Sequence, residues 1–84
     1  MTPRFELVSK EGCHLCEDFL QALVRLQAEA HFEMEVIDIQ QNERMQAQYA
    51  DKIPVLLFQG EMVCHYYLAP EKVRSVLTQY DRVR

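Results

Sequence analysis

The sequence of 84 residues has no tryptophan, two glycines, three prolines and three cysteines. Three cysteines are too few, and an odd number, for the disulfide framework of a small secreted domain, so paired cysteines here are expected to be redox-active or metal-binding. Basic residues are also few, with nine Lys and Arg against 13 Asp and Glu and a net charge of −4. That balance argues against nucleic acid or an anionic membrane as the partner, because both bind basic surfaces.

Long apolar runs are missing as well. No stretch approaches the ~20 apolar residues that cross a membrane, and the segment from Met1 to Phe5 lacks the basic and apolar regions of a secretory signal. We therefore expect a cytoplasmic protein. The apolar fraction of 49% and the charged fraction of 26% are those of an ordinary globular domain. Residues 1–84 are expected to form a single domain and a monomer.

The spacing of the apolar residues predicts the element order β-α-β-α-β-β-α. Apolar positions that recur at steps of three and four indicate helices, and short apolar or alternating runs between turn residues indicate strands. Helices are expected over 14–30, 43–49 and from 70 onward, and strands over 5–8, 33–39, 55–58 and 62–65, with a three-residue turn at 59–61. The first β-α-β unit requires a parallel strand pair with a right-handed crossover. We predict a four-stranded mixed sheet with helices on both faces.

Cys13 and Cys16 are separated by two residues, where the first strand has ended and the first helix begins. Free backbone N–H groups and the helix dipole at that place favour the thiolate, which is the nucleophile in disulfide exchange. Cys16, on the same face of the first turn, can then attack a mixed disulfide on Cys13. We predict an exposed attacking Cys13 and a buried resolving Cys16. We expect Lys10 and a protonated His14 to stabilise the thiolate, and the acidic neighbours Glu11, Glu17 and Asp18 to destabilise it.

A zinc site is the alternative interpretation of the same cysteine pair. Structural zinc sites need four ligands, and the candidates in this chain are Cys13, His14, Cys16, Cys64 and His65. His14 lies between the two cysteines and does not readily point with them, while Cys64 and His65 are adjacent on a strand and face opposite ways. A redox pair therefore accounts for the spacing better than a metal site does, and no metal ligand is assigned.

These features resemble the thioredoxin-fold redox proteins, and among them the short glutaredoxin-like proteins, over nearly the whole chain. The resemblance rests on the element order, on Cys13-His14-Leu15-Cys16, on Ile53-Pro54-Val55 before the third strand, and on Lys10, where glutaredoxins carry a lysine. It implies a thioredoxin/glutaredoxin-like α/β fold and a cis peptide bond before Pro54, which faces the cysteine pair. The carbonyl and amide of the residue before this proline would then pair with an extended peptide or with glutathione.

The sequence departs from glutaredoxins at two places. His14 and Leu15 stand where glutaredoxins usually have Pro and Tyr, and Cys64-His65-Tyr66-Tyr67 replaces the Gly-Gly pair and acidic residue whose backbone holds glutathione. Side chains there occupy places where the family has bare backbone, and His65 or a tyrosine hydroxyl is the candidate replacement for those contacts. Cys64 is either a third redox thiol or a small buried apolar residue. The two tyrosines are neighbours on an extended chain, so one is expected to pack against the last helix.

The resemblance implies a thiol-disulfide oxidoreductase of cell redox homeostasis. The expected catalytic pair is Cys13 and Cys16. Lys10 and His14 are expected to tune the thiolate. The expected substrate-binding residues are Ile53, Pro54, Cys64 and His65. The expected partners are a disulfide-bearing protein or a low-molecular-weight thiol, without a tightly bound cofactor and with glutathione as the candidate co-substrate. Two alternatives stay open: a module that handles an iron-sulfur cluster or another metal, and a non-enzymatic thioredoxin-fold interaction domain.

Overall fold

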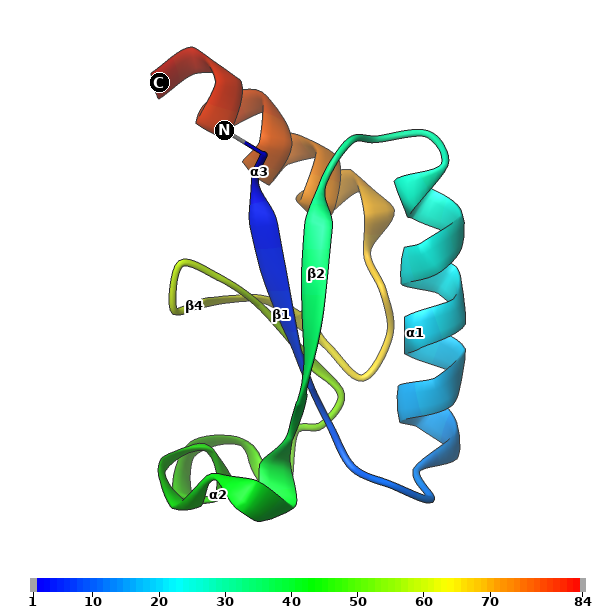
Figure 1. Ribbon diagram of the computed structural model, residues 1–84, viewed down its shortest axis with the longest axis vertical. Coiled ribbons are helices and arrows are strands. Elements are labelled where there is room, and N and C mark those ends of the chain that lie inside the picture. Colours follow the sequence, from blue (N-terminus) through cyan, green and yellow to red (C-terminus); the bar gives the residue numbers. More distant parts are fainter. Residues whose placement is uncertain (1, 84) are drawn as a thin grey trace.

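The computed structural model of the chain describes residues 2–83 and contains the predicted elements in the predicted order, with one additional 3₁₀ helix. The elements are β1 (Arg4–Ser9), α1 (His14–Gln27), β2 (Glu33–Asp38), the 3₁₀ helix η1 (Ile39–Gln41), α2 (Glu43–Tyr49), β3 (Val55–Phe58), β4 (Glu61–His65) and α3 (Pro70–Val83) (Figure 1). Within residues 2–83, no helix has both the length and the apolar character that crossing a membrane requires.

Two predicted elements extend past the ends that the structure gives them. The first helix was expected to reach residue 30, but it ends at Gln27, where the Ala28 N–H donates to the Arg25 carbonyl and tightens the last turn. The second strand was expected to include Ile39, but it ends at Asp38, whose carboxylate accepts the Gln40 N–H at 2.9 Å. That capping bond begins η1, because a short acidic side chain competes with the strand ladder for the backbone.

The hairpin between β3 and β4 has a two-residue turn where three residues were expected. Gln59 and Gly60 both have positive φ angles, of 53° and 85°. Two consecutive positive φ values are typical of the type I′ turn, whose twist matches that of the strands it joins. Glu61 therefore belongs to β4. From this turn the two strands pair in one register as far as Leu57, and the register shifts between Leu57 and Leu56.

The four strands lie in the order β2-β1-β3-β4. β1 pairs in parallel with β2 and antiparallel with β3, and β3 pairs antiparallel with β4. The sheet is therefore mixed, with β1 and β3 in the middle and β2 and β4 at the edges. The β1-α1-β2 unit supplies the parallel pair, as the element order predicted.

Helices cover both faces of this sheet, which confirms the predicted fold class. On one face the strand residues Phe5, Leu7 and Leu56 pack with Leu23 of α1 and Val73 of α3, all of them fully buried. On the other face, apolar residues of η1 and α2 pack against β1 and β3 in a second cluster that contains Val8, Ile39, Val55 and Leu57 with Met45 and Tyr49. The alternation of neighbouring strand residues between the two clusters follows from the period of two in a strand.

The strand registers bring three loops to one end of the sheet. Ser9 pairs with Asp38, Val8 with Val55, and Val55 with His65. The ends of β1, β2 and β4 and the start of β3 therefore meet at the same end, where Figure 1 shows both the loop into α1 and α2, at the bottom of the view. Segments 10–13, 51–54 and 66–67 all leave the sheet there, although they lie far apart in the sequence.

Candidate redox site

Cys13 is held at the first position before α1 by a tight turn. The Cys13 N–H donates to the Lys10 carbonyl at 3.3 Å, and Gly12 has a φ of 81° at the third position of this turn. A type II turn requires a positive φ at that position, which glycine adopts without steric cost. Cys13 itself is extended, with φ −94° and ψ 109°, and its carbonyl accepts the Glu17 N–H at 3.1 Å. Cys13 is thus the N-cap residue of α1.

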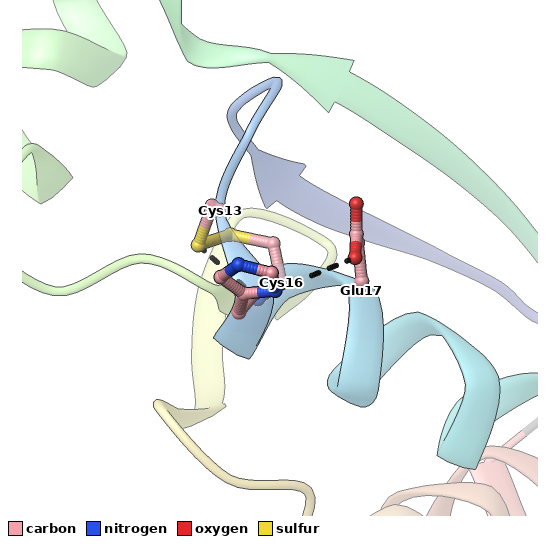
Figure 2. The surroundings of a disulfide bond; sticks show 4 residues. Cys13, Cys16 and Glu17 are labelled. Carbon is pink, nitrogen blue, oxygen red and sulfur yellow. Dashed lines mark hydrogen bonds and ion pairs between the residues drawn. A yellow bond between two sulfur atoms is a disulfide. The ribbon is translucent and has the colours of Figure 1, made fainter.

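The two cysteines are joined as a disulfide, with their Cα atoms 5.2 Å apart (Figure 2). The Cys13 sulfur also accepts a hydrogen bond from the Cys16 N–H at 3.1 Å, as the side chain of an N-cap residue does. Cys16 is 2% exposed and lies on the buried face of α1 with Phe19 and Leu23, whereas Cys13 is half-buried. The predicted difference in burial between the two cysteines is confirmed, although Cys13 is less open than expected.

The two residues expected to tune the thiolate are both exposed. The His14 imidazole is 98% exposed, and its Nδ1 lies 3.9 Å from the Glu17 carboxylate, an approach marked in Figure 2. Lys10 is also exposed. In the described part of the chain, neither residue forms a hydrogen bond with either cysteine sulfur, and the backbone N–H of Cys16 is the donor that reaches the Cys13 sulfur. The N-terminus of α1 is therefore the part of the chain that contacts the Cys13 sulfur with a donor and favours a negative charge on it.

The Ile53–Pro54 peptide bond is cis, as the resemblance implied. Pro54 is fully buried, and its carbonyl accepts the Tyr66 N–H at 2.8 Å. Within residues 2–83, the backbone N–H and carbonyl of Ile53 take part in no hydrogen bond with another part of the chain. The backbone of this half-buried residue, at the same end of the sheet as the cysteines, is therefore available for pairing with an extended ligand.

Cys64 and His65, expected to bind substrate, lie in different surroundings. Cys64 is 6% exposed and packs in the core cluster between the sheet, α1 and α3, so its side chain offers no surface to a substrate. Burial raises the pKa of its thiol, more than the nearby Ala69 backbone and Lys72 lower it. The ring of half-buried His65 lies 4.6 Å from the ring of Tyr66. Over residues 2–83, no group of three or more His, Cys, Asp and Glu side chains is arranged to hold a metal ion.

The raised pKa of Cys64 predicts a loss of stability in alkali. With the Cys13–Cys16 disulfide intact, Cys64 is the free thiol of the chain. Above about pH 8.5, the ordinary pKa of a thiol, the unfolded chain loses the Cys64 proton while the folded chain retains it. The free energy of unfolding of the oxidised protein should therefore fall as the pH rises through this range. Urea unfolding between pH 7 and pH 10 measures it, and Cys64→Ala should show a shallower fall. Equal slopes for both proteins would contradict the prediction.

Tyr66 was considered from the sequence as a residue that lines a substrate groove, but its backbone turn and its attachment to Asp51 and Pro54 were not predicted. It has a φ of 64°, its hydroxyl donates to the Asp51 carbonyl at 2.6 Å, and its N–H donates to Pro54. Tyr66 and Tyr67 are 40% and 73% exposed, so the expectation that one of them is packed away against the last helix is wrong. The reason is that the chain turns at Tyr66 and is not extended there. The signal in the sequence was that Tyr66 lies in the stretch expected to replace the glutaredoxin Gly-Gly pair, because glycine adopts positive φ without steric cost.

Comparison with known proteins extends these observations. Residues 4–78 match the family model described as glutaredoxin-like domain (DUF836). Protein Ne2328 from Nitrosomonas europaea, solved by NMR in solution, is 35% identical with a TM-score of 0.82, over 90% of this chain and 92% of that one. An uncharacterized protein of Mycobacterium tuberculosis is 27% identical over 78 residues, which cover 87% of this chain and 80% of that protein. Thioredoxin 1 from Thermosipho africanus shares the fold, at 16% identity and a TM-score of 0.62, over 93% and 98% of the two chains.

Proposed function

This chain belongs to the family of glutaredoxin-like domains (DUF836), and from that premise we propose that it is a thiol-disulfide oxidoreductase that works through Cys13 and Cys16. One observation carries the proposal. The Cys13 sulfur stands at the N-terminus of α1, accepts the Cys16 N–H at 3.1 Å, and is within disulfide distance of a second sulfur that is 2% exposed. A backbone donor and the helix dipole stabilise a thiolate at Cys13, and burial protects Cys16 from direct attack.

In the first step, the Cys13 thiolate attacks one sulfur of a substrate disulfide. A bond forms between Cys13 and that sulfur, the substrate S–S bond breaks, and the other substrate sulfur leaves as a thiolate that takes a proton from water. In the second step, Cys16 loses its proton to water and its thiolate attacks the Cys13 sulfur. The bond between Cys13 and the substrate sulfur breaks, the substrate leaves as a thiolate that takes a proton from water, and the Cys13–Cys16 disulfide forms. The substrate gains two electrons, and the protein dithiol loses them.

The segment before Pro54 is the proposed docking surface for that substrate. The Ile53 N–H and carbonyl are available for main-chain pairing, and an extended peptide next to a disulfide supplies the matching groups. No tightly bound cofactor enters this scheme. Glutathione is the proposed co-substrate, which restores the Cys13–Cys16 dithiol after each turnover in the reducing cytoplasm. We propose that the protein acts there as a monomer.

A redox titration tests the proposed couple. The protein is equilibrated in buffers with stepwise ratios of reduced to oxidised dithiothreitol, free thiols are alkylated, and the added mass is measured. We expect one reversible two-electron transition, in which the ratio of dithiol to disulfide changes tenfold for each change of about 30 mV in potential.

Cys64→Ala is the matched control for this titration and should retain the transition, because Cys64 is buried and unpaired. Cys13→Ala should abolish it. Absence of a reversible transition in the wild-type protein would overturn the proposed function.

A further inference from the structure

Tyr66 adopts a backbone conformation that side chains rarely adopt. Its φ is 64°, and the Tyr67 N–H donates to the His65 carbonyl at 2.7 Å, which closes a three-residue γ-turn with Tyr66 at its centre. A γ-turn with positive φ at its centre is rare and strained, and a non-glycine residue persists in one only where its surroundings hold it there. Glycine would form this turn without steric cost, so the contacts of the tyrosine side chain are the candidates for what offsets the strain.

The side chain adds a second attachment to the segment 51–54. The Tyr66 N–H donates to the Pro54 carbonyl at 2.8 Å, at one end of this segment. The Tyr66 hydroxyl donates to the Asp51 carbonyl at 2.6 Å, at its other end. The His65 ring contacts the Tyr66 ring, with the ring centroids 4.6 Å apart and the ring planes tilted by 54°. One residue therefore holds both ends of the four-residue segment that contains Ile53.

We propose that Tyr66 is a positioning residue, which holds segment 51–54 in the conformation where the Ile53 backbone pairs with an extended peptide disulfide. This inference rests on the proposed function. An unpaired backbone segment at a sheet end samples several conformations, and a substrate that binds only one of them must first order it. The two bonds from Tyr66 supply that order before the substrate arrives. Tyr66 touches neither sulfur in this scheme, so its effect is on substrate binding and not on the exchange reaction itself.

Tyr66→Phe tests the proposal, since it removes the hydroxyl and leaves the ring and the turn. The probe is a single-cysteine peptide joined to thionitrobenzoate, whose release is followed by absorbance. We expect KM for this peptide to rise about 2- to 10-fold, the effect of one hydrogen bond, with kcat unchanged. Hydroxyethyl disulfide has no peptide backbone to pair with Ile53, so its KM should not change. Tyr67→Phe is the matched control and should behave as the wild type, because among the described residues the Tyr67 hydroxyl has no hydrogen-bond partner.

Tyr66→Gly separates this role from a merely structural one. It relieves the strained φ and removes the hydroxyl, so it should fold at least as stably as Tyr66→Phe and still show the raised KM for the peptide. Amide hydrogen exchange gives a readout that does not depend on turnover. The N–H of Lys52, which donates to Tyr49 at 2.8 Å, and the N–H at position 66 should exchange faster in Tyr66→Phe than in the wild type.

An unchanged KM for the peptide in both variants would overturn the inference. So would an equal loss of activity toward both disulfides, accompanied by a lower melting temperature, because that pattern belongs to a residue needed only for folding. If the wild type reduced neither disulfide, the proposed function would fail. Amide exchange at positions 52 and 66 would then still decide whether Tyr66 orders this segment.

Discussion

Cys16→Ser is expected to trap Cys13 in a stable mixed disulfide with its substrate, whereas Cys13→Ser is expected to trap nothing. Cys16 supplies the sulfur within bonding distance of Cys13, with the two Cα atoms 5.2 Å apart. A serine hydroxyl at that position cannot displace a thiol from a disulfide, so the first step proceeds and the second stops. Mass spectrometry of the unreduced protein, after incubation with the peptide–thionitrobenzoate disulfide, measures the adduct as one added peptide.

The same pair of variants should differ in turnover. Cys13→Ser removes the nucleophile, and reduction of a disulfide should fall on the order of 10³-fold or more, since loss of a nucleophile is among the largest single effects in an enzyme. Cys64→Ala is the control, because Cys64 is a buried core residue, and it should neither trap a substrate nor lose turnover. An adduct on Cys16 in Cys13→Ser would reverse the two roles. No adduct in either variant would contradict the assignment of Cys13 as the attacking thiol.

Phe5→Ala is expected to have the largest effect on stability. Phe5 is fully buried in the central strand β1, and its ring lies 5.1 Å from that of Phe32 and 4.9 Å from that of Phe58. Truncation of a buried phenylalanine to alanine costs about 3–5 kcal/mol, through lost burial and the cavity that remains. The whole free energy of unfolding of a domain is about 5–15 kcal/mol. Thermal unfolding followed by circular dichroism should therefore show a fall in melting temperature of more than about 10 °C.

Val24→Ala on α1 is the matched control for Phe5→Ala. The Val24 side chain is 51% exposed, and a substitution at such a surface position usually changes the free energy of unfolding by no more than about 0.5 kcal/mol. A similar loss in both variants would show that the burial of Phe5 does not account for the loss of stability in Phe5→Ala. A melting temperature of Phe5→Ala within a few degrees of the wild type would contradict the prediction directly.

Much of the fold could be predicted because the signals are local. The steps of three and four in α1 and the apolar run of β3 depend only on neighbouring residues, and the β3 and α2 bounds were predicted as the structure has them. The errors lie at element ends, where one capping bond decides the outcome. The carboxylate of Asp38 begins η1, and a two-residue turn with positive φ at Gln59 and Gly60 moves Glu61 into β4.

The candidate site was predictable to the extent that its chemistry is carried by a short motif. The position of Cys13 before a helix sufficed to predict free backbone N–H groups near its sulfur and a buried Cys16, and the structure adds that the sulfur caps the helix. The tuning roles of Lys10 and His14 stay predictions, since the structure shows neither in contact with a sulfur. Cys64 was placed among the substrate-binding residues because it lies in the stretch that replaces the glutaredoxin Gly-Gly pair, yet it faces the core, since strand residues alternate between faces.

By itself, the sequence determined the order of elements, the mixed sheet and the cysteine pair at the start of α1. Each of these depends on the periodicity of nearby residues or on the capping of one helix. Only the tertiary structure decided how segment 66–67 meets segment 51–54, because the register of β1, β3 and β4 brings both to the end of the sheet where segment 10–13 lies. The attachment of Tyr66 to Asp51 and Pro54 joins residues that are distant in sequence. No local pattern encodes such a contact, since it forms only once the strands have paired.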